Sequence, residues 1–235
     1  MNYLGSTKST LNSLLFIFPF IILYEIIAFF KFKNLSYQIR NTADIIIRDF
    51  ISIFSEKVML IYSLLLFFII LLYFILNIKN TVRINFNLSH VFFMYIEGFF
   101  YGFILILLLN GFTVFSYNNT FLSNDLILSF YFCLGASIWE EILFRLFCFS
   151  SILFFLKKVH ISNYDSIITA GIISSLLFSM FHYIGSLADV FTLYSFLIRF
   201  VGGLYLSALY YYRGLGIAMM CHFTYDFILL MLPYI

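Results

Sequence analysis

Long apolar runs separated by short polar stretches dominate the pattern of hydrophobic and polar positions along the chain. A helix needs roughly 20 apolar residues to cross the hydrocarbon core of a bilayer, and seven runs approach or exceed that length. They are Leu11–Phe30, Val58–Asn77, Val91–Phe115, Leu126–Leu156, Ile167–Ile184, Val190–Tyr212 and Leu215–Leu232. Because a segment inside lipid must satisfy its own backbone hydrogen bonds, each run is expected to form a helix. The pattern therefore predicts an all-α protein, a polytopic membrane helical bundle.

The stretch at about 36–57 has a different pattern. It mixes the charged residues Arg40, Asp44, Arg48 and Asp49 with isoleucines and phenylalanines. Such a mixture is typical of an amphipathic helix that lies at the membrane interface. A re-entrant element or one more crossing of the membrane is the alternative, so seven to eight transmembrane helices are expected.

Composition agrees with lipid as the solvent, since 63% of the residues are hydrophobic and only 10% are charged. A soluble domain has roughly 25% charged residues. The net charge of +2, with no basic run and no glycine-rich phosphate loop, argues against a nucleic-acid partner. The abundance of phenylalanine, with 34 residues, suggests an AT-rich bacterial genome. We therefore expect an integral protein of a bacterial cytoplasmic membrane.

Charged residues inside the apolar runs are the candidates for chemistry. Glu140, Glu141 and Arg145 lie near the centre of the fourth run, where each charge costs about 2.5–3.5 kcal/mol or more. Positions four apart share a helix face, so Glu141 and Arg145 can pair. Glu140 points about 100° away from Glu141 and is free to face another group.

Three further polar residues can meet Glu140 in one internal cavity. His182 lies near the end of the fifth run, and His222 and Asp226 are four apart in the seventh. Straight helices would set His182 at a different depth from Glu140. A tilted or shifted fifth helix is therefore required for them to meet.

These residues form three short motifs, which occur in order on separate predicted helices. They are EExxxR at Glu140–Arg145, FxxxH at Phe178–His182 and HxxxD at His222–Asp226. The set resembles the CPBP family, also called Abi or CAAX-protease-like, whose members include the type II CAAX prenyl endopeptidases. Arg199, with the two glycines that follow it, is similar to the family's stretch between the second and third motifs. The resemblance covers roughly residues 126–232.

The resemblance implies an intramembrane glutamic endopeptidase that cleaves a peptide or a membrane-protein substrate. It implies that Glu140 and His182 activate a water molecule, and that His222 and Asp226 bind the oxyanion. It gives supporting roles to Glu141, Arg145, Phe178 and Arg199. It also implies two parts, namely N-terminal membrane helices with the interfacial segment over 1–125 and a four-helix catalytic core over 126–235.

Asp226 departs from the family pattern, which has asparagine at this position. An ionised aspartate cannot donate a hydrogen bond to an oxyanion. Asp226 must therefore be protonated, or it orients His222, which then faces the oxyanion alone. The departure also motivates an alternative function, a non-catalytic regulatory or bacteriocin-immunity membrane protein that acts by binding a partner. A proton-coupled transporter is a third hypothesis, without an inverted repeat to support it.

Cofactors and the remaining intramembrane carboxylates leave further alternatives. The four motif residues Glu140, His182, His222 and Asp226 also make a nitrogen and oxygen set that suits zinc, but no HExxH sequence occurs. A mechanism without metal is therefore preferred. Elsewhere in the chain, Glu25 and Glu97 are expected to line the same cavity, to pair with Arg199 or to lie near an interface. Close to the second of these, Gly98 and Gly102 form a small-xxx-small pair, which favours close helix packing.

Overall fold

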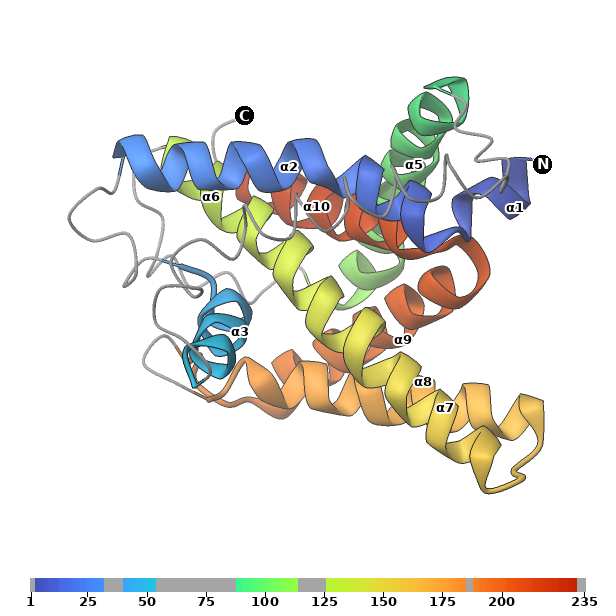
Figure 1. Ribbon diagram of the computed structural model, residues 1–235. Coiled ribbons are helices and arrows are strands. Elements are labelled where there is room, and N and C mark those ends of the chain that lie inside the picture. The colour runs from blue at the N-terminus through green and yellow to red at the C-terminus, as the bar shows by residue number, and fades with distance from the viewer. Residues whose placement is uncertain (1–2, 32–39, 54–87, 114–125, 185–187, 232–235) are drawn as a thin grey trace.

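The protein is built from helices throughout the part of the chain that the structure describes. The structure, a computed structural model, describes residues 3–31, 40–53, 88–113, 126–184 and 188–231 (Figure 1). In chain order the helices are α1 (Tyr3–Thr7), α2 (Thr10–Lys31), α3 (Thr42–Ser52), α5 (Leu88–Thr113), α6 (Leu126–Gly135), η1 (Ala136–Glu140), η2 (Ile142–Phe149), α7 (Ser150–Lys158), α8 (Asn163–Phe181), α9 (Leu193–Arg213) and α10 (Leu215–Met231). These ranges contain no strand, which confirms the all-α prediction.

Five helices in the described ranges are long and apolar enough to cross a membrane. They are Asn12–Lys31, Ser89–Leu109, Leu126–Lys158, Asn163–Phe181 and Leu193–Arg213. Helix α10 has 17 residues, or about 25 Å, which is shorter than a hydrocarbon core of about 30 Å. The predicted span Val58–Asn77 lies outside the described residues. The expected count of seven to eight spans is therefore not confirmed.

Large apolar side chains cover the outer faces of these helices. Phe30 on α2 is 78% exposed, and Phe92, Phe99 and Leu107 on α5 are more than half exposed. Water would penalise so large an apolar surface, whereas lipid does not. Together with the lengths of the spans, this apolar surface indicates an integral membrane protein.

One continuous helix of 33 residues, Leu126–Lys158, runs diagonally across the bundle from α6 to α7 (Figure 1). Its middle is π-helical over η1 and η2, and the EExxxR motif lies in this stretch. A π-helical turn is wider than an α-helical turn and is frequently found at functional sites. The sequence pattern predicts the helix but not its wider turns.

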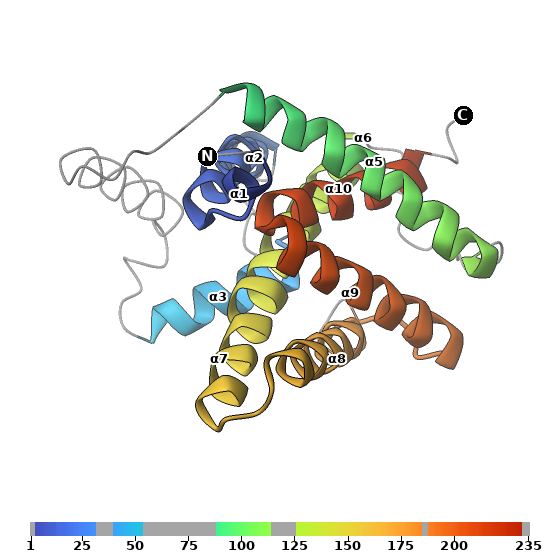
Figure 2. The same cartoon turned by 90° about the vertical axis from the view of Figure 1, so that its right-hand side faces the viewer.

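Helix α10 lies at the centre of the bundle and contacts α2, α5, α6, α9 and both π-helical segments. It packs along α5 (Figure 2), where a Cβ at Gly98 would lie 2.5 Å from Cβ of Met220. At Gly102 the corresponding distance to Cβ of Thr224 is 2.6 Å. The two glycines therefore let α5 approach α10 closely, as the small-xxx-small spacing predicts.

The connection between α9 and α10 is a tight turn at Gly214, whose φ is +94°. Any residue other than glycine would have a strained backbone at this φ, and its Cβ would lie 2.3 Å from the carbonyl oxygen of Thr7. The turn reverses the chain directly, so α10 packs against α9 and enters the bundle. This placement brings His222 and Asp226 to the middle of the protein.

Helix α3 is the described part of the amphipathic stretch predicted at about 36–57. Its charged residues Asp44 and Arg48 are buried, whereas Ile46, Phe50 and Ile53 are 43% to 76% exposed. The polar face thus turns into the protein and the apolar face turns outward. Lipid explains this direction, because a charged group in lipid is stable only where it finds partners.

Candidate active site

The Glu140 carboxylate is the centre of the candidate site. The residue ends η1 and is only 5% exposed. Its Oε1 atom accepts a hydrogen bond of 2.9 Å from Nδ2 of Asn41. Its Oε2 atom lies 3.8 Å from Nε2 of His182 and has no hydrogen-bond partner among the described residues. One oxygen is therefore held, and the other faces a histidine.

His182 follows the last residue of α8 and still reaches Glu140. Its Nδ1 atom lies 2.9 Å from the carbonyl oxygen of Phe178. A carbonyl oxygen only accepts, so the ring donates from Nδ1, and Nε2 of the neutral ring is an acceptor. The expected mismatch in depth between the two residues is thus absent, and Glu140 and His182 come together.

The aromatic ring of Phe178 joins the two histidines of the site. Its centroid lies 5.0 Å from the ring of His182 and 5.9 Å from the ring of His222, both edge-on. The guanidinium carbon of Arg145 lies 4.5 Å from the same centroid. Phe178 therefore packs α8 against the EExxxR segment and α10, which explains the phenylalanine in the FxxxH motif.

His222 is held between two carboxylates. Its Nδ1 atom lies 2.8 Å from Oε1 of Glu141, and its Nε2 atom lies 3.4 Å from Oδ2 of Asp226. His222 and Glu141 are buried, whereas the side chain of Asp226 is 27% exposed. Asp226 thus lies beside the Nε2 atom of His222, and Glu141 makes the closer contact to this ring.

Glu141 and Arg145 form the ion pair that their spacing predicts. The two groups are 3.0 Å apart, and both side chains are completely buried. Arg145 also donates to the carbonyl oxygen of Gly203 on α9 at 3.4 Å. A Cβ at Gly203 would lie 3.2 Å from Phe178, so this glycine lets α9 pack against α8. Arg145 and Glu141 therefore join α8, α9 and α10 to the helix that carries Glu140.

Arg199 holds the segment that follows His182. It donates to Oη of Tyr183 at 2.9 Å and to Ser195, and it pairs with Asp189. The backbone nitrogen of Asp189 donates to the carbonyl oxygen of His182 at 2.9 Å. Arg199 thus supports the segment after His182 from the neighbouring helix.

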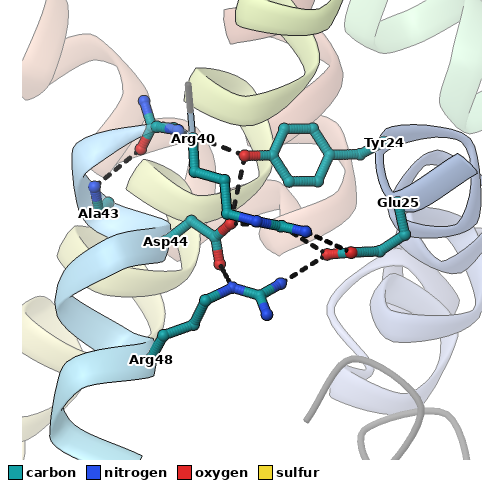
Figure 3. A network of polar contacts seen from close by, with 7 residues as sticks. Tyr24, Glu25, Arg40, Ala43, Asp44 and Arg48 are labelled. Atoms are coloured by element: carbon teal, nitrogen blue, oxygen red, sulfur yellow. Dashed lines mark hydrogen bonds and ion pairs between the residues drawn. The ribbon is translucent and has the colours of Figure 1, made fainter. Parts of the chain in front are cut away.

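Neither Glu25 nor Glu97 pairs with Arg199. Glu97 accepts hydrogen bonds from Arg213, at 2.7 Å for its Nη2 atom, and from Tyr3. Glu25 binds two arginines near α3, and Figure 3 shows its carboxylate between them. Both carboxylates are therefore neutralised by arginines away from the Arg199 segment.

Asn41 is a residue of the site that sequence reasoning misses. It caps the N-terminus of α3 and contacts Glu140, which is 99 positions away in the chain. Asparagine is a preferred N-cap residue, so its position directly before a helix is consistent with a cap. No periodicity or motif relates it to Glu140, so the contact is visible only in the fold.

A cavity lies apart from these residues. A cavity of about 390 Å³ is lined by Lys8, Lys157 and Tyr210 among others, and by none of the four predicted catalytic residues. Over the described ranges, no group of three or more His, Cys, Asp or Glu side chains is arranged to hold a metal ion.

Comparison with known families agrees with the motifs. Residues 122–228 match the family model described as type II CAAX prenyl endopeptidase Rce1-like. The predicted resemblance is confirmed. The comparison with curated proteins finds no match. The comparison with solved structures finds none either.

The matched segment, residues 122–228, contains the seven residues of the three motifs and Arg199. It runs from just before α6 into α10 and so includes the described helices of the predicted C-terminal part except the last residues of α10. The family is one of proteases, and the match indicates a membrane endopeptidase of the CAAX-protease type. Asn41 and its neighbours on α2 and α3 lie outside this segment.

Proposed function

We propose that the protein is an intramembrane endopeptidase in which Glu140 and His182 activate a water molecule to hydrolyse a peptide bond. One observation carries the proposal. The buried Oε2 atom of Glu140 and the Nε2 atom of His182 face each other at 3.8 Å. When the carboxylate is ionised and the imidazole neutral, both atoms are acceptors. A water molecule bound to both would direct its lone pairs outward, toward a substrate carbonyl.

The proposed reaction is balanced by one proton that Glu140 takes and returns. The water oxygen attacks the carbonyl carbon while its proton moves to Oε2 of Glu140. The tetrahedral intermediate then collapses, the carbon–nitrogen bond breaks, and the proton passes to the leaving amine. The products are a new carboxylate and a new amine, and the glutamate is ready for another turnover.

His222 is proposed to stabilise the negative charge that develops on the carbonyl oxygen. Its closer contact, to Glu141, fixes the ring, and its longer contact, to Asp226, is the one that a substrate oxygen would replace. A fixed, preorganised donor in a site shielded from water is an effective way to stabilise an oxyanion. In this scheme Asp226 orients the ring between turnovers and does not donate to the substrate.

The proposal includes no metal. A zinc ligand must offer a free nitrogen lone pair, and both nitrogens of His222 already face carboxylates. The substrate is proposed to be a peptide or a membrane protein that reaches the site from lipid. A non-catalytic, partner-binding role is the second hypothesis, and the match to a protease family does not favour it.

The proposal is tested with full-length protein in lipid nanodiscs. Wild type, Glu140→Gln and His182→Ala are incubated with a fluorogenic farnesylated CAAX peptide and with a mixture of unmodified peptides. Asp165→Asn serves as a control, because Asp165 is an exposed carboxylate at the start of α8. We expect cleavage by wild type and the control, and a roughly 10²- to 10⁴-fold loss in the other two variants. Equal cleavage by folded Glu140→Gln and wild type would sink the proposal.

A further inference from the structure

The N-terminal part of the chain contributes a side chain to the candidate site. Nδ2 of Asn41 donates to Oε1 of Glu140 at 2.9 Å, and this hydrogen bond joins two segments 99 residues apart. Asn41 lies outside the segment that matches the Rce1-like model. The contact therefore belongs to this fold and to no motif.

The direction of the Asn41 amide follows from its second contact. Its Oδ1 atom accepts a hydrogen bond of 2.8 Å from the backbone nitrogen of Ala43, the usual bond of a helix N-cap. With the oxygen committed to the start of α3, the amide nitrogen must point the other way. That nitrogen faces Glu140, so the cap also fixes the orientation of the donor.

A group of four charges, three of them buried, holds α3 in place, and we call it the four-charge cluster. It consists of Glu25 on α2 with Arg40, Asp44 and Arg48 (Figure 3). Arg40 forms two parallel hydrogen bonds with Glu25, at 2.9 and 2.8 Å, and a third with Asp44. Arg48 binds the same two carboxylates at 2.7 and 2.9 Å. Two positive and two negative groups thus neutralise each other.

Arg40 keeps its positive charge within this cluster. Burial by itself lowers the pKa of Arg40, but the hydrogen bonds and charges of Glu25 and Asp44 outweigh burial and raise that pKa. The guanidinium therefore stays charged, and the bidentate geometry it forms with Glu25 is a strong and directional one. Asn41 follows Arg40 directly, so this bond fixes the backbone from which the Asn41 amide projects.

Asn41 is also held by close packing against the helix that carries Glu140. The backbone nitrogen of Asn41 donates to Oη of Tyr24 at 3.3 Å, and Tyr24 donates to Asp44. A Cβ at Gly135 would lie 2.9 Å from the Tyr24 ring and 3.1 Å from Cβ of Asn41. The glycine one turn before Glu140 therefore makes room for Asn41 to reach the carboxylate.

We infer that Asn41 is a positioning residue for Glu140, held by the four-charge cluster, and this inference rests on the proposed function. The amide occupies Oε1 and leaves Oε2 as the oxygen that faces His182. A donor to a carboxylate favours its ionised form, which is the form that accepts a proton from water. Asn41 thus determines which oxygen of Glu140 faces His182.

Two substitutions separate this role from helix capping. Asn41→Asp and Asn41→Ser both keep a good N-cap acceptor, so α3 is expected to form in both. Both lose the amide donor to Glu140, and Asn41→Asp adds a carboxylate beside it. Ile46→Ala, on the exposed face of α3, is the matched control. Two other titratable groups near Glu140 are not substituted, namely His182, which follows α8, and Arg145 on the same helix as Glu140.

The first readout needs no substrate. Dicyclohexylcarbodiimide modifies protonated carboxyl groups in apolar surroundings, and mass spectrometry measures the modification of Glu140 as a function of pH. We expect the labelling curves of Asn41→Ser and Asn41→Asp to move about one pH unit higher than wild type, because losing a hydrogen bond to a charged group shifts an equilibrium roughly tenfold. Superimposed curves for wild type and both variants would overturn the inference.

The second readout is the pH profile of kcat on the farnesylated CAAX peptide. We expect a roughly tenfold lower kcat in both variants and an acid limb displaced to higher pH, with KM little changed and Ile46→Ala like wild type. Unchanged profiles in folded variants would also overturn the inference. If wild type cleaves no peptide, the proposed function fails, and the labelling curves still decide the role of Asn41.

Discussion

Nδ1 of His222 lies 2.8 Å from Oε1 of Glu141, and this contact joins the first and third motifs. Glu141 also pairs with Arg145, so one buried carboxylate serves both a histidine and an arginine. The adjacent Glu140 remains available for chemistry because Glu141 satisfies these groups. Two consecutive glutamates thus have different tasks, one structural and one proposed as catalytic.

Removing the charge of Glu141 is expected to destabilise the protein severely. Glu141→Gln leaves Arg145 buried without its partner, and such a loss costs about 3–5 kcal/mol. The double variant Glu141→Gln/Arg145→Met removes both charges and is expected to unfold at a higher temperature than either single variant. Thermal unfolding in detergent measures this. If the stability losses of the two single variants simply add up in the double variant, the pairing is contradicted.

Helix packing at Gly102 is expected to control activity through α10. Gly102→Ala places a Cβ 2.6 Å from Thr224, which forces α10 away from α5 and costs about 1–3 kcal/mol. Thr224 lies between His222 and Asp226, so peptidase activity should fall together with stability. Gly171→Ala is the control, because its nearest neighbour, Phe149, is 3.9 Å away. A Gly102→Ala protein as stable and active as Gly171→Ala would argue against this packing.

The sequence predicts contacts within one helix better than contacts between distant segments. The pair of Glu141 and Arg145 follows from a spacing of four, because that spacing puts both on one helix face. The order of the motifs also predicts that His182 and His222 lie near Glu140. The hydrogen bond from Asn41 does not follow from any spacing, because it depends on how α3 folds back against η1.

The direction of α3 is the other feature that pattern alone leaves open. Alternating polar and apolar positions show that a helix has two faces, but they do not show which environment each face meets. In a water-soluble protein the apolar face of such a helix would be buried. In this protein Asp44 and Arg48 are buried and Phe50 is exposed, because lipid surrounds the outside of the protein and Arg48 pairs with Glu25 on its inner side.

Arg199 is expected to affect catalysis by supporting the segment after His182. Arg199→Ala removes its contacts to Tyr183 and Asp189, so the His182 end of α8 loses its restraint. We expect a fall in kcat of roughly tenfold, the usual scale for losing one charged hydrogen bond, with normal folding. The kcat of Asp189→Ala should also decrease, and the kcat of the double variant should be little lower than that of either single variant. Kinetics on the peptide probe measure all three, and fully multiplicative losses would disprove the shared role.

Peptidase activity is expected to survive metal chelation. The two nitrogens of His222 face Glu141 and Asp226, which leaves no free lone pair for a metal. Treatment with 1,10-phenanthroline should therefore leave the cleavage rate within a factor of about two of the untreated protein, a change of less than 0.5 kcal/mol. Loss of activity on chelation, with recovery on adding zinc, would contradict this prediction.

If Glu140 hydrolyses peptide bonds in the membrane, its activity leaves new peptide termini in the cell. Cells lacking the native gene express wild type or Glu140→Gln at matched membrane levels, and mass spectrometry compares the peptide termini in membranes and medium. We expect a set of new termini that appears with wild type and is missing with Glu140→Gln. Identical sets of termini, with both proteins equally abundant and folded, would contradict the claim.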